Sequence, residues 1–222
     1  PCANIGKHPR TAHGLKDATT DPAIIRAWWE RWPKANVAIV TGPAAGIFAF
    51  DLDRHDDAAD GLEHFNALCS ELGVSMPDTP RAFTGGNGVH VIVRHPGAGV
   101  RITSRGKASA LRPGVEVKGD DGYIIVEPSK HKSGGGYQWE AAAMPIGPDA
   151  VAVADCPAAL LEMIATTPKP RRTPAAGPKA SYLEAAFDAA GLIVAPADKQ
   201  GRIAVQCPWE REHTGGSGIT ST

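Results

Sequence analysis

The sequence predicts an α+β fold built from antiparallel hairpins and a few helices. Three pairs of short β-type runs are separated by segments rich in Gly, Pro, Asn or Asp, which is the usual pattern of β-hairpins. Two other runs, residues 22–32 and 58–72, carry apolar side chains at helical spacing. At 222 residues, the chain suits one large domain with a small appendage.

Composition argues against several classes of protein. The formal net charge of -1 gives no overall basic field, so any polyanion must bind at a local patch. The four cysteines are scattered along the chain, which argues against a disulfide framework and favours the reducing cytoplasm. No apolar run reaches the length of a membrane span, and no signal peptide is visible. Because the chain begins at Pro1 and ends in a Gly/Ser/Thr run, we expect it to be part of a longer protein.

The N-terminal residues 1–20 should form a polar, basic loop, in which Lys7 and Arg10 are candidates to contact the phosphates of a nucleotide. A helix should follow over residues 22–32, because Asp21 is a good N-cap and the next residue is a proline, which is favoured in the first helical turn. The apolar stripe of this helix contains three tryptophans, and such a stripe packs in a core far more often than it stacks on bases. We therefore expect core positions for Trp28, Trp29 and Trp32.

Three hairpins are expected, each with turn-forming residues between two β-type runs. They pair residues 36–41 with 46–52, 79–84 with 89–93, and 114–118 with 123–126. Between the first and the second hairpin, residues 58–72 should form a helix that Gly73 closes. A shorter helix is expected over residues 157–165.

The strand at residues 46–52 runs into the acidic pair Asp51 and Asp53. Side chains alternate along a strand, so the two carboxylates should point to the same side at its end. Like charges this close repel each other unless a cation lies between them, and oxygen ligands of this kind suit Mg²⁺ or Mn²⁺. The alternative is a solvated strand end at which the aspartates merely form a turn.

Two later β-type segments offer further groups for the same site. Glu116 could supply a third carboxylate, and such a set can hold two cations about 3.5–4 Å apart, as in two-metal phosphoryl transfer. His90 and Lys118 could then neutralise the phosphates of a nucleotide. A single histidine beside apolar residues is more often structural, so a core role for His90 stays open.

A second basic stretch, residues 97–112, precedes Glu116 and contains several Gly and Ser residues, which indicates a mobile loop. Since the chain is nearly neutral, contacts to a polyanion such as DNA must come from local basic side chains. Contacts to phosphates carry no base information, so binding of this kind should tolerate any nucleic-acid sequence. The candidates are Arg101, Arg105, Lys107 and Arg112.

The C-terminal part differs in character. Residues 166–180 are typical of a Pro-rich linker, and residues 181–191 carry apolar side chains at helical spacing. Nearer the end, Cys207 and His213 resemble half of a Cys/His zinc motif. A structural zinc site usually takes four ligands, so we expect no zinc here. The expected division is a domain at 1–165, a linker at 166–180 and a small second segment at 181–222.

Taken together, the residues resemble the bifunctional primase–polymerase domain of the archaeo-eukaryotic primase superfamily, found in plasmid, phage and prophage replication proteins. The resemblance covers about residues 6–139, and so many matches in order are more specific than any one of them. Its motifs are Gly-Lys-His-Pro-Arg-Thr (6–11), Trp28-Trp29, Asn-Val-Ala-Ile (36–39), Asp-Leu-Asp-Arg-His (51–55), Gly-Gly-Asn-Gly-Val-His (85–90), Pro-Gly-Val-Glu-Val-Lys-Gly-Asp-Asp-Gly-Tyr (113–123) and Pro-Ser-Lys-His (128–131).

The resemblance implies that the metal ligands are Asp51, Asp53 and Glu116, the last in place of the Asp of many relatives. The family's second motif is a small residue–x–His that contacts nucleotide phosphates. It falls on residues 88–90, where Gly88 replaces the more usual Ser and so lacks its hydroxyl. Weaker matches place three more residues at the nucleotide, namely Lys118, Ser129 and His131. The implied fold is an α/β unit packed on an RRM-like sheet, with the active site in the cleft between them.

The implied function is that of a DNA-dependent primase and polymerase, which makes and extends primers on single-stranded DNA from deoxyribonucleotides or ribonucleotides. Such an enzyme uses two Mg²⁺ or Mn²⁺ ions for nucleotidyl transfer and serves the replication of a mobile element or phage. Relatives often carry a helicase downstream, so a helicase is an expected partner in the full-length protein.

Two other functions stay open. A haloacid-dehalogenase-like phosphohydrolase also places DxD after an apolar strand, and Gly119-Asp120-Asp121 mimics its late acidic motif. However, Asp53 is followed by Arg-His-Asp rather than by the Gly-Thr/Val-Leu run of that class, and few residues are left for a doubly wound domain. The second alternative is a non-catalytic, RRM-like DNA-binding module of a replication initiator. Such a module gains nothing from three carboxylates that face phosphate.

Overall fold

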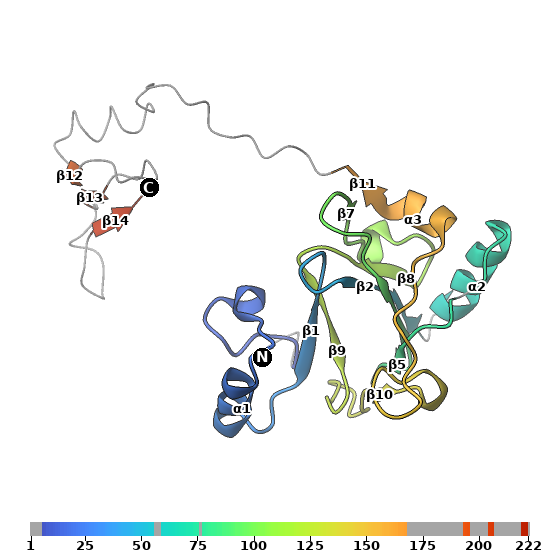
Figure 1. Ribbon diagram of the computed structural model, residues 1–222, viewed down its shortest axis with the longest axis horizontal. Coiled ribbons are helices and arrows are strands. Elements are labelled where there is room, and N and C mark those ends of the chain that lie inside the picture. Colours follow the sequence, from blue (N-terminus) through green and yellow to red (C-terminus); the bar gives the residue numbers. More distant parts are fainter. Residues whose placement is uncertain are drawn as a thin grey trace. The chain divides into compact units, whose positions relative to one another are not determined.

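The computed structural model describes residues 6–55, 59–75 and 77–167, together with the backbone of three short strands nearer the C-terminus (Figure 1). The chain divides into two compact units, residues 1–169 and 170–222. In the second unit the three strands form an antiparallel sheet in the order β12 (Ile193–Ala195), β13 (Ala204–Gln206) and β14 (Ile219–Ser221). The helix expected at 181–191, most of the linker expected at 166–180, and both Cys207 and His213 lie outside the described residues.

The first unit is built on a five-stranded antiparallel sheet with helices packed on it, so the α+β prediction is confirmed. The strands lie in the order β10 (Gln138–Trp139), β5 (Arg81–Phe83), β6 (Val89–Arg94), β2 (Ile47–Leu52) and β8 (Val115–Lys118). Strand β2 lies between β6 and β8, and all its residues after Ile47 are buried. A strand that is buried on both faces reads as a continuous apolar run, which is the pattern before Asp51.

A separate two-stranded ribbon, β1 (Val37–Thr41) paired with β9 (Gly122–Val126), lies over one face of this sheet. The first and the third expected hairpins are therefore wrong, because β1 and β9 pair with each other while β2 and β8 pair within the sheet. The chain turns near Gly42 and Gly119 as it passes from one sheet to the other, and between β1 and β2 the pairing is limited to a bridge of Gly42 with Ile47. The second hairpin, β5 with β6, is confirmed.

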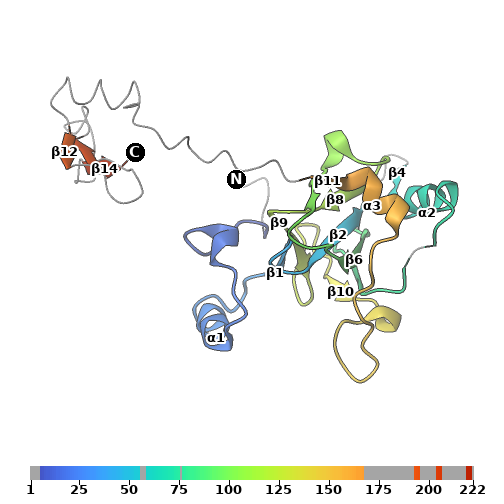
Figure 2. The same cartoon turned by 45° about the horizontal axis from the view of Figure 1, so that its top comes forward.

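Apolar side chains on the two faces of the sheet form two cores. On one face the sheet packs against α2 (Gly61–Glu71) and α3 (Ala158–Ile164), and the ring centroids of Phe50 and Phe65 lie 4.8 Å apart. On the other face, a smaller cluster that contains Ala49 and Ile92 packs against the ribbon. The sheet is thus the middle of three layers, with helices on one side and the ribbon on the other (Figure 2).

Both helices that cover the sheet lie within the ranges expected for them. Asp60 caps α2, since its side chain accepts from the N–H groups of Leu62 at 3.0 Å and Glu63 at 3.2 Å. After the helix, Gly73 takes a φ of 65°, the left-handed conformation that favours glycine at a helix end. Local capping signals therefore set both ends of α2.

The N-terminal helix α1, Pro22–Arg31, is confirmed as a helix, and Asp21 caps it by accepting from the N–H of Ala23 at 2.8 Å. The expectation that its tryptophans belong to a core is wrong, because no residue of α1 is buried. The two faces of the sheet are already covered by α2, α3 and the ribbon, so α1 can pack only on the outer side of the ribbon. There an open hollow of about 570 Å³ is lined by the N-terminal loop and by Trp28, Trp29 and Trp32.

Short elements complete the first unit. Two further strand pairs join β3 (Arg54–His55) with β4 (Ala59–Asp60), and β7 (Arg101–Ile102) with β11 (Ala165–Thr166). Turns of 3-10 helix occur at Gly14–Asp17, Lys107–Ser109 and Ala141–Ala143. Among the helices in the described part of the chain, none has the length and apolar character needed to cross a membrane.

Two side-chain contacts hold the corner at which the ribbon leaves the sheet. The hydroxyl of Thr41 donates to the carbonyl oxygen of Gly119, and Nε2 of the buried His95 lies 2.9 Å from Oδ1 of Asp120. Gly119 is packed so tightly that a Cβ there would lie 2.2 Å from the carbonyl oxygen of Ile102. The corner therefore depends on a residue without a side chain at position 119.

The substitution Gly119→Ala should destabilise the first unit by about 1–3 kcal/mol or more, because the new methyl group meets backbone atoms that cannot move aside at low cost. A thermal melt measures the effect. Gly99→Ala is the matched control, since a Cβ at position 99 meets nothing within 4 Å. Equal melting temperatures for the two variants would show that the corner tolerates a side chain.

Candidate active site

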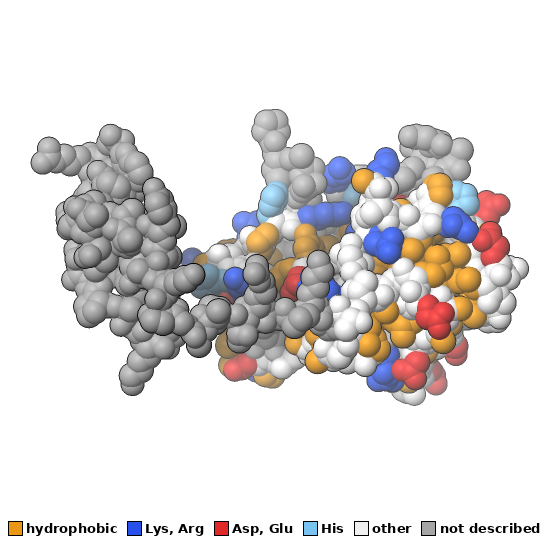
Figure 3. Space-filling view, turned by 90° about the horizontal axis from the view of Figure 1, so that it is seen from above, with side chains coloured by type: hydrophobic (Ala, Val, Ile, Leu, Met, Phe, Trp, Pro, Cys, Tyr) orange, Lys and Arg blue, Asp and Glu red, His pale blue; other side chains and the backbone are white. Residues whose placement is uncertain are grey.

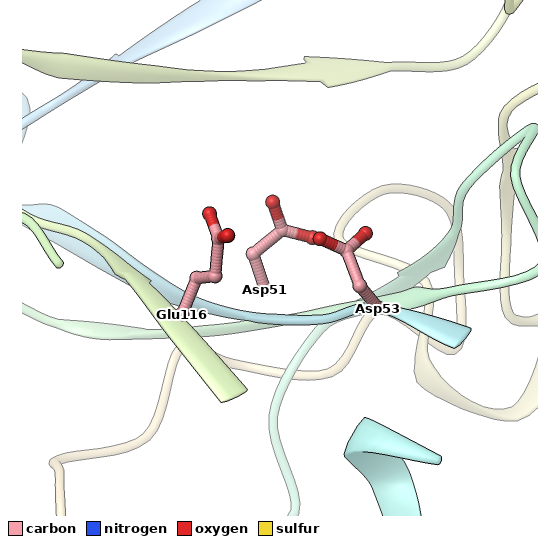
Figure 4. A group of neighbouring side chains, drawn as sticks. All are labelled: Asp51, Asp53 and Glu116. Carbon is pink, nitrogen blue, oxygen red and sulfur yellow. The ribbon is translucent and has the colours of Figure 1, made fainter. Parts of the chain in front are cut away.

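The register of β2 brings the predicted carboxylates together. Asp51 lies directly opposite His90 of β6 on one side and opposite Glu116 of β8 on the other. Residues opposite each other in an antiparallel pair point to the same face, and Asp53, two residues further along, shares it. Carboxylate oxygens of Asp51, Asp53 and Glu116 all lie within 4.8 Å of one another. Figure 4 shows the three side chains projecting from neighbouring strands into the same space.

The carboxylate cluster begins where the apolar core under the ribbon ends. Ala49 and Ile92 lie opposite each other and pack against the ribbon, whereas the next pair along the strands with side chains on this face is Asp51 and His90. Asp51 is only 8% exposed, and Asp53 and Glu116 are half-buried. Partial removal from water strengthens the repulsion among the three carboxylates, and it equally strengthens their attraction for a cation.

Two glycines hold the backbone of Asp53 in place. Its N–H donates to the carbonyl oxygen of Gly114 at 2.8 Å, and its own carbonyl oxygen accepts from the N–H of Gly61 at 2.9 Å. A Cβ on Gly61 would lie 2.2 Å from the carbonyl oxygen of Gly114 and 2.7 Å from that of Asp53. Only glycine fits at position 61 in this arrangement, which joins the start of α2 to the end of β2.

Lys118 neutralises part of the cluster. Its Nζ lies 3.0 Å from Oδ2 of Asp51 and 2.8 Å from Oε2 of Glu116. Burial alone would lower the pKa of Lys118, but the charges of the two carboxylates outweigh it and raise this pKa above its ordinary value. Burial alone would likewise raise the pKa of Asp51, yet His90 and then Lys118 hold that pKa well below its ordinary value. Asp51 and Lys118 are therefore both charged near neutral pH.

His90 lies beside Asp51 and away from solvent. The residue is 5% exposed, and its Nε2 is 3.3 Å from Oδ1 of Asp51. Its other ring nitrogen, Nδ1, makes no hydrogen bond to another described residue. From the neighbouring strand, His90 thus orients the carboxylate of Asp51.

Tyr137 is a site residue that sequence reasoning missed. It is 5% exposed, and its ring centroid lies 6.2 Å from that of His90 and 6.4 Å from that of His131. Burial raises the pKa of its hydroxyl, and the charges of Asp51 and Asp53 raise it further. The hydroxyl is therefore a neutral group beside the acidic cluster. The only sequence signal was the spacing of Tyr137 and Trp139, which are two residues apart and so should share one face of a strand. Trp139 packs in the core under the ribbon.

The other predicted nucleotide contacts do not gather in one place. Ser129 is buried, and its Oγ accepts a hydrogen bond from the backbone of β1 at 2.8 Å, so it holds the ribbon together. Arg10 lines the hollow beside the tryptophans. His131 lies beside the buried tyrosine, and its pKa is lowered by burial and then by the nearby charge of Lys7. Lys7 therefore lies near His131 and also lines the same hollow as Arg10, whereas Ser129 is bound into the ribbon.

The surroundings of Gly88 leave no room for a side chain. A Cβ there would lie 2.6 Å from the carbonyl oxygen of Leu52 and 3.3 Å from Cα of Asp53. The N–H of Gly88 donates to Oγ1 of Thr84 at 2.9 Å. The turn at 84–88 consequently packs directly on the backbone at the end of β2.

The four basic residues predicted to contact DNA are engaged in different ways. Arg105 donates to a backbone carbonyl of α3 at 3.2 Å, and Arg112 pairs with a glutamate of α2 at 2.7 Å. Arg101 and Lys107 are exposed, and Arg101 lies 3.7 Å from an exposed aspartate. The segment passes close to the acidic cluster, since a Cβ on Gly106 would lie 4.0 Å from Oε2 of Glu116.

Charge on the surface is mixed. On the face drawn in Figure 3, the Lys and Arg side chains are interspersed with Asp and Glu side chains. This pattern accords with the formal net charge of -1. Any contact with a polyanion must therefore depend on a few local cations rather than on the field of the whole protein.

The donor set of the acidic cluster fits Mg²⁺ or Mn²⁺. The three side chains offer only carboxylate oxygens, the ligands that these hard cations prefer, and no thiol is among them. Within the described residues, the buried Oδ1 of Asp51 has Nε2 of His90 as an ion-pair partner at 3.3 Å but makes no hydrogen bond of good geometry. A buried acceptor that lacks a hydrogen bond is costly, and coordination of a metal would satisfy it.

Residues 1–159, well over half of the chain, match the family described as bifunctional DNA primase/polymerase, N-terminal. No curated protein and no solved structure matches the chain.

Replacing Lys118 by Met should destabilise the metal-free protein by about 2 kcal/mol, because the clustered carboxylates then lose their cation. Adding Mn²⁺ should raise the melting temperature of Lys118→Met more than that of the wild type. Lys107→Met, which removes an exposed ammonium from the neighbouring loop, should respond to Mn²⁺ as the wild type does. Equal Mn²⁺ shifts for all three proteins would show that Lys118 is not the counter-ion of the cluster.

Proposed function

The chain belongs to the bifunctional DNA primase/polymerase family, and from this premise we propose that it makes and extends primers on single-stranded DNA by two-metal nucleotidyl transfer. The observation that carries the proposal is the meeting of three carboxylates, from β2, from the residue just after it and from β8, on one face of the sheet. In the reaction, the 3′ oxygen of the primer bonds to the α-phosphorus of the incoming nucleotide. The bond from that phosphorus to the bridging oxygen breaks, pyrophosphate leaves, and the hydroxyl proton passes to water.

Asp51, Asp53 and Glu116 would hold the two Mg²⁺ or Mn²⁺ ions. Ions of this kind, when bound, stabilise the charge on both the attacking and the leaving oxygen of such a displacement. The protein's own part is to keep three oxygen donors in fixed positions. The strand register places them, the glycine contacts hold the backbone of Asp53, and His90 orients Asp51.

We assign the polyphosphate of the incoming nucleotide to the Lys118 end of the cluster. Lys118 lies opposite Ala49, two residues before Asp51, and carries a full positive charge beside the carboxylates. Charge-assisted hydrogen bonds from Lys or His to phosphate oxygens are among the stronger polar contacts. His90, His131 and Lys7 are the further candidates for the nucleotide.

Two weaker candidates receive different assignments. Arg10 stays a candidate contact for the nucleotide, and it lines the hollow on the outer side of the ribbon together with Lys7. For Ser129 we propose a supporting role, because its hydroxyl is bonded to the backbone of β1.

Of the two alternative functions, the phosphohydrolase is disfavoured by the topology. A haloacid-dehalogenase-like enzyme has a doubly wound parallel sheet, whereas Asp51 lies on a strand with antiparallel neighbours on both sides. Asp120, from the stretch that mimicked its late acidic motif, pairs with the buried His95 instead. The non-catalytic DNA-binding module is disfavoured by the clustered carboxylates, since they repel the phosphates of DNA.

The resemblance alone supports the remaining parts of the proposal. The enzyme would act in the cytoplasm, in the replication of a phage or another mobile element, and a helicase would work with it.

The variant Asp51→Asn should lose nucleotide incorporation at least about a hundredfold, because metal stabilisation of the transition state is worth several kcal/mol. The assay contains single-stranded template, labelled nucleotides and Mn²⁺ or Mg²⁺, with and without a primer. Asp155→Asn is the matched control, since that carboxylate is 86% exposed and lies outside the cluster. Near-normal synthesis by Asp51→Asn would refute the proposed site.

We also expect DNA binding to weaken steeply with salt, because each neutralised phosphate releases a counter-ion. Replacing the two exposed cations Arg101 and Lys107 by Ala should make the salt dependence shallower by about 1.4 in log–log slope, at roughly 0.7 for each contact to a single strand. Fluorescence anisotropy with a labelled oligonucleotide at several salt concentrations measures the slope. An unchanged slope for this variant, together with a flattened one after changes at Lys7 and Arg10, would place the DNA along the N-terminal loop instead.

A further inference from the structure

The hydroxyl of Tyr137 is a polar group beside the acidic cluster that has no part in the function proposed above. Tyr137 is only 5% exposed, and a tyrosine buried to this degree usually has a hydrogen-bond partner for its hydroxyl. Here the hydroxyl makes no hydrogen bond to a described residue, yet it is not one of the enclosed side-chain atoms that lack such a bond. The ring is therefore buried, while the hydroxyl oxygen at its tip stays open to a ligand.

Strand pairing places Tyr137 on the face of the sheet that carries the carboxylates. Trp139 of β10 lies opposite Ala82 of β5, which in turn lies opposite His90. Since His90 lies opposite Asp51, all four side chains point to the same face. Tyr137 comes two residues before Trp139 and shares this face by alternation. The distance of 6.2 Å between the ring centroids of Tyr137 and His90 agrees with this placement.

On that face, Tyr137 lies toward Asp53 and away from Lys118. Because the strands are antiparallel, a step backwards along β10 corresponds to a step forwards along β5, backwards along β6 and forwards along β2. A step forwards along β2 leads from Asp51 to Asp53, whereas Lys118 lies opposite Ala49, in the other direction. The tyrosine hydroxyl and the ammonium group therefore flank Asp51 from two sides.

The sugar is the part of a nucleotide that fits the position of the tyrosine hydroxyl. With the polyphosphate at Lys118 and the α-phosphate at the carboxylates, the sugar, which is bonded to the α-phosphate, extends toward Asp53 and Tyr137. A sugar carries no charge, so it tolerates a neighbouring carboxylate that would repel a further phosphate. The neutral hydroxyl of Tyr137 can contact a sugar without adding charge.

Tyr137 is fixed in place and cannot easily move away from such a ligand. Its ring packs between those of His90 and His131, with centroids 6.2 Å and 6.4 Å away. Its backbone N–H donates to the carbonyl oxygen of Ser129 at 2.9 Å, and the hydroxyl of Ser129 is bonded to β1. A close-packed wall of this kind accepts a ligand that fits, whereas one additional atom on the ligand meets the same penalty as overpacking of a core.

The sugars of the two classes of nucleotide differ by one such atom, the 2′ oxygen. Resting on the proposed function, we propose that Tyr137 selects the sugar of the incoming nucleotide. Its hydroxyl fills the space beside the 2′ carbon and so admits deoxyribonucleoside triphosphates in preference to ribonucleoside triphosphates. The phenolic oxygen and the 2′ oxygen are of the same size, so removing the first makes room for the second.

The first test measures extension of a primed template that contains only thymine ahead of the primer, with either dATP or ATP. Tyr137→Phe should lower the ratio of kcat/KM for dATP to that for ATP about 5- to 150-fold. The ratio should fall because kcat/KM for ATP rises while that for dATP stays unchanged. A merely structural role for Tyr137 would lower both values together.

Two controls accompany this test. Tyr123→Phe removes a hydroxyl that donates to the carbonyl oxygen of Lys7 at 2.9 Å, and this variant should keep the wild-type ratio. A thermal melt of Tyr137→Phe should give the wild-type melting temperature, because the ring is kept and no hydrogen bond to a described residue is lost.

The second test measures binding without any synthesis. The protein is titrated by calorimetry with dATP or ATP in the presence of Mn²⁺ and without template or primer. The wild type should bind dATP more tightly than ATP, whereas Tyr137→Phe should bind the two nucleotides equally.

The outcomes separate the inference from the proposed function. If the wild type synthesises DNA but the ratio is unchanged in Tyr137→Phe, the sugar site is overturned and the proposed function stands. If Tyr137→Phe alters only the discrimination between DNA-ended and RNA-ended primers, the inference is also overturned, because Tyr137 then contacts the primer. If the wild type makes no product but loses its binding preference for dATP in Tyr137→Phe, the proposed synthesis fails while the sugar site stands.

Discussion

Mutual repulsion among three carboxylates is the constraint on which the rest of the first unit depends. Asp51, Asp53 and Glu116 can be held this close only if their backbones cannot move apart. The register of β2 between β6 and β8 provides this rigidity, since a slip of one residue would turn every side chain of β2 to the opposite face. Such a slip would carry Phe50 and Leu52, which are both buried against the helices, out of their core. Apolar burial on the helix face thus holds the acidic residues on the ribbon face.

The three layers explain why the site lies where it does. The ribbon covers the sheet only as far as Ala49 and Ile92. Two residues further along each strand, the side chains on this face belong to the acidic site instead of the apolar core. Carboxylates placed at that boundary are partly desolvated and still reachable by a nucleotide and a cation. Carboxylates placed further under the ribbon would be buried and out of reach of a ligand. Carboxylates placed further from the ribbon would be screened by water. Lys118, on the same face, offsets part of the charge.

Local sequence patterns predicted the parts of the fold that local physics decides. The cap at Asp60, the stop at Gly73 and the turn between β5 and β6 follow from neighbouring residues, and the acidic face follows from alternation along β2. The pairing of β1 with β9 could not be predicted in this way, because both strands would satisfy their backbones equally well in hairpins with their sequence neighbours. The partial exposure of Trp28 and Trp29 depends on which layers meet, and the ion pairs of Lys118 depend on the pairing of β8 with β2. Both are properties of the whole chain.

The ammonium group within the acidic cluster also separates folding from metal loading. In many small metal-binding domains the ion is part of the folding free energy, so removing it unfolds the chain. Here a covalently attached cation already sits between Asp51 and Glu116, and the hydrophobic layers on both sides of the sheet owe nothing to an ion. A chelator would therefore leave an intact, idle domain that recovers as soon as metal returns. Metal supply would act on such a protein as a reversible control of rate, without exposing it to aggregation or proteolysis.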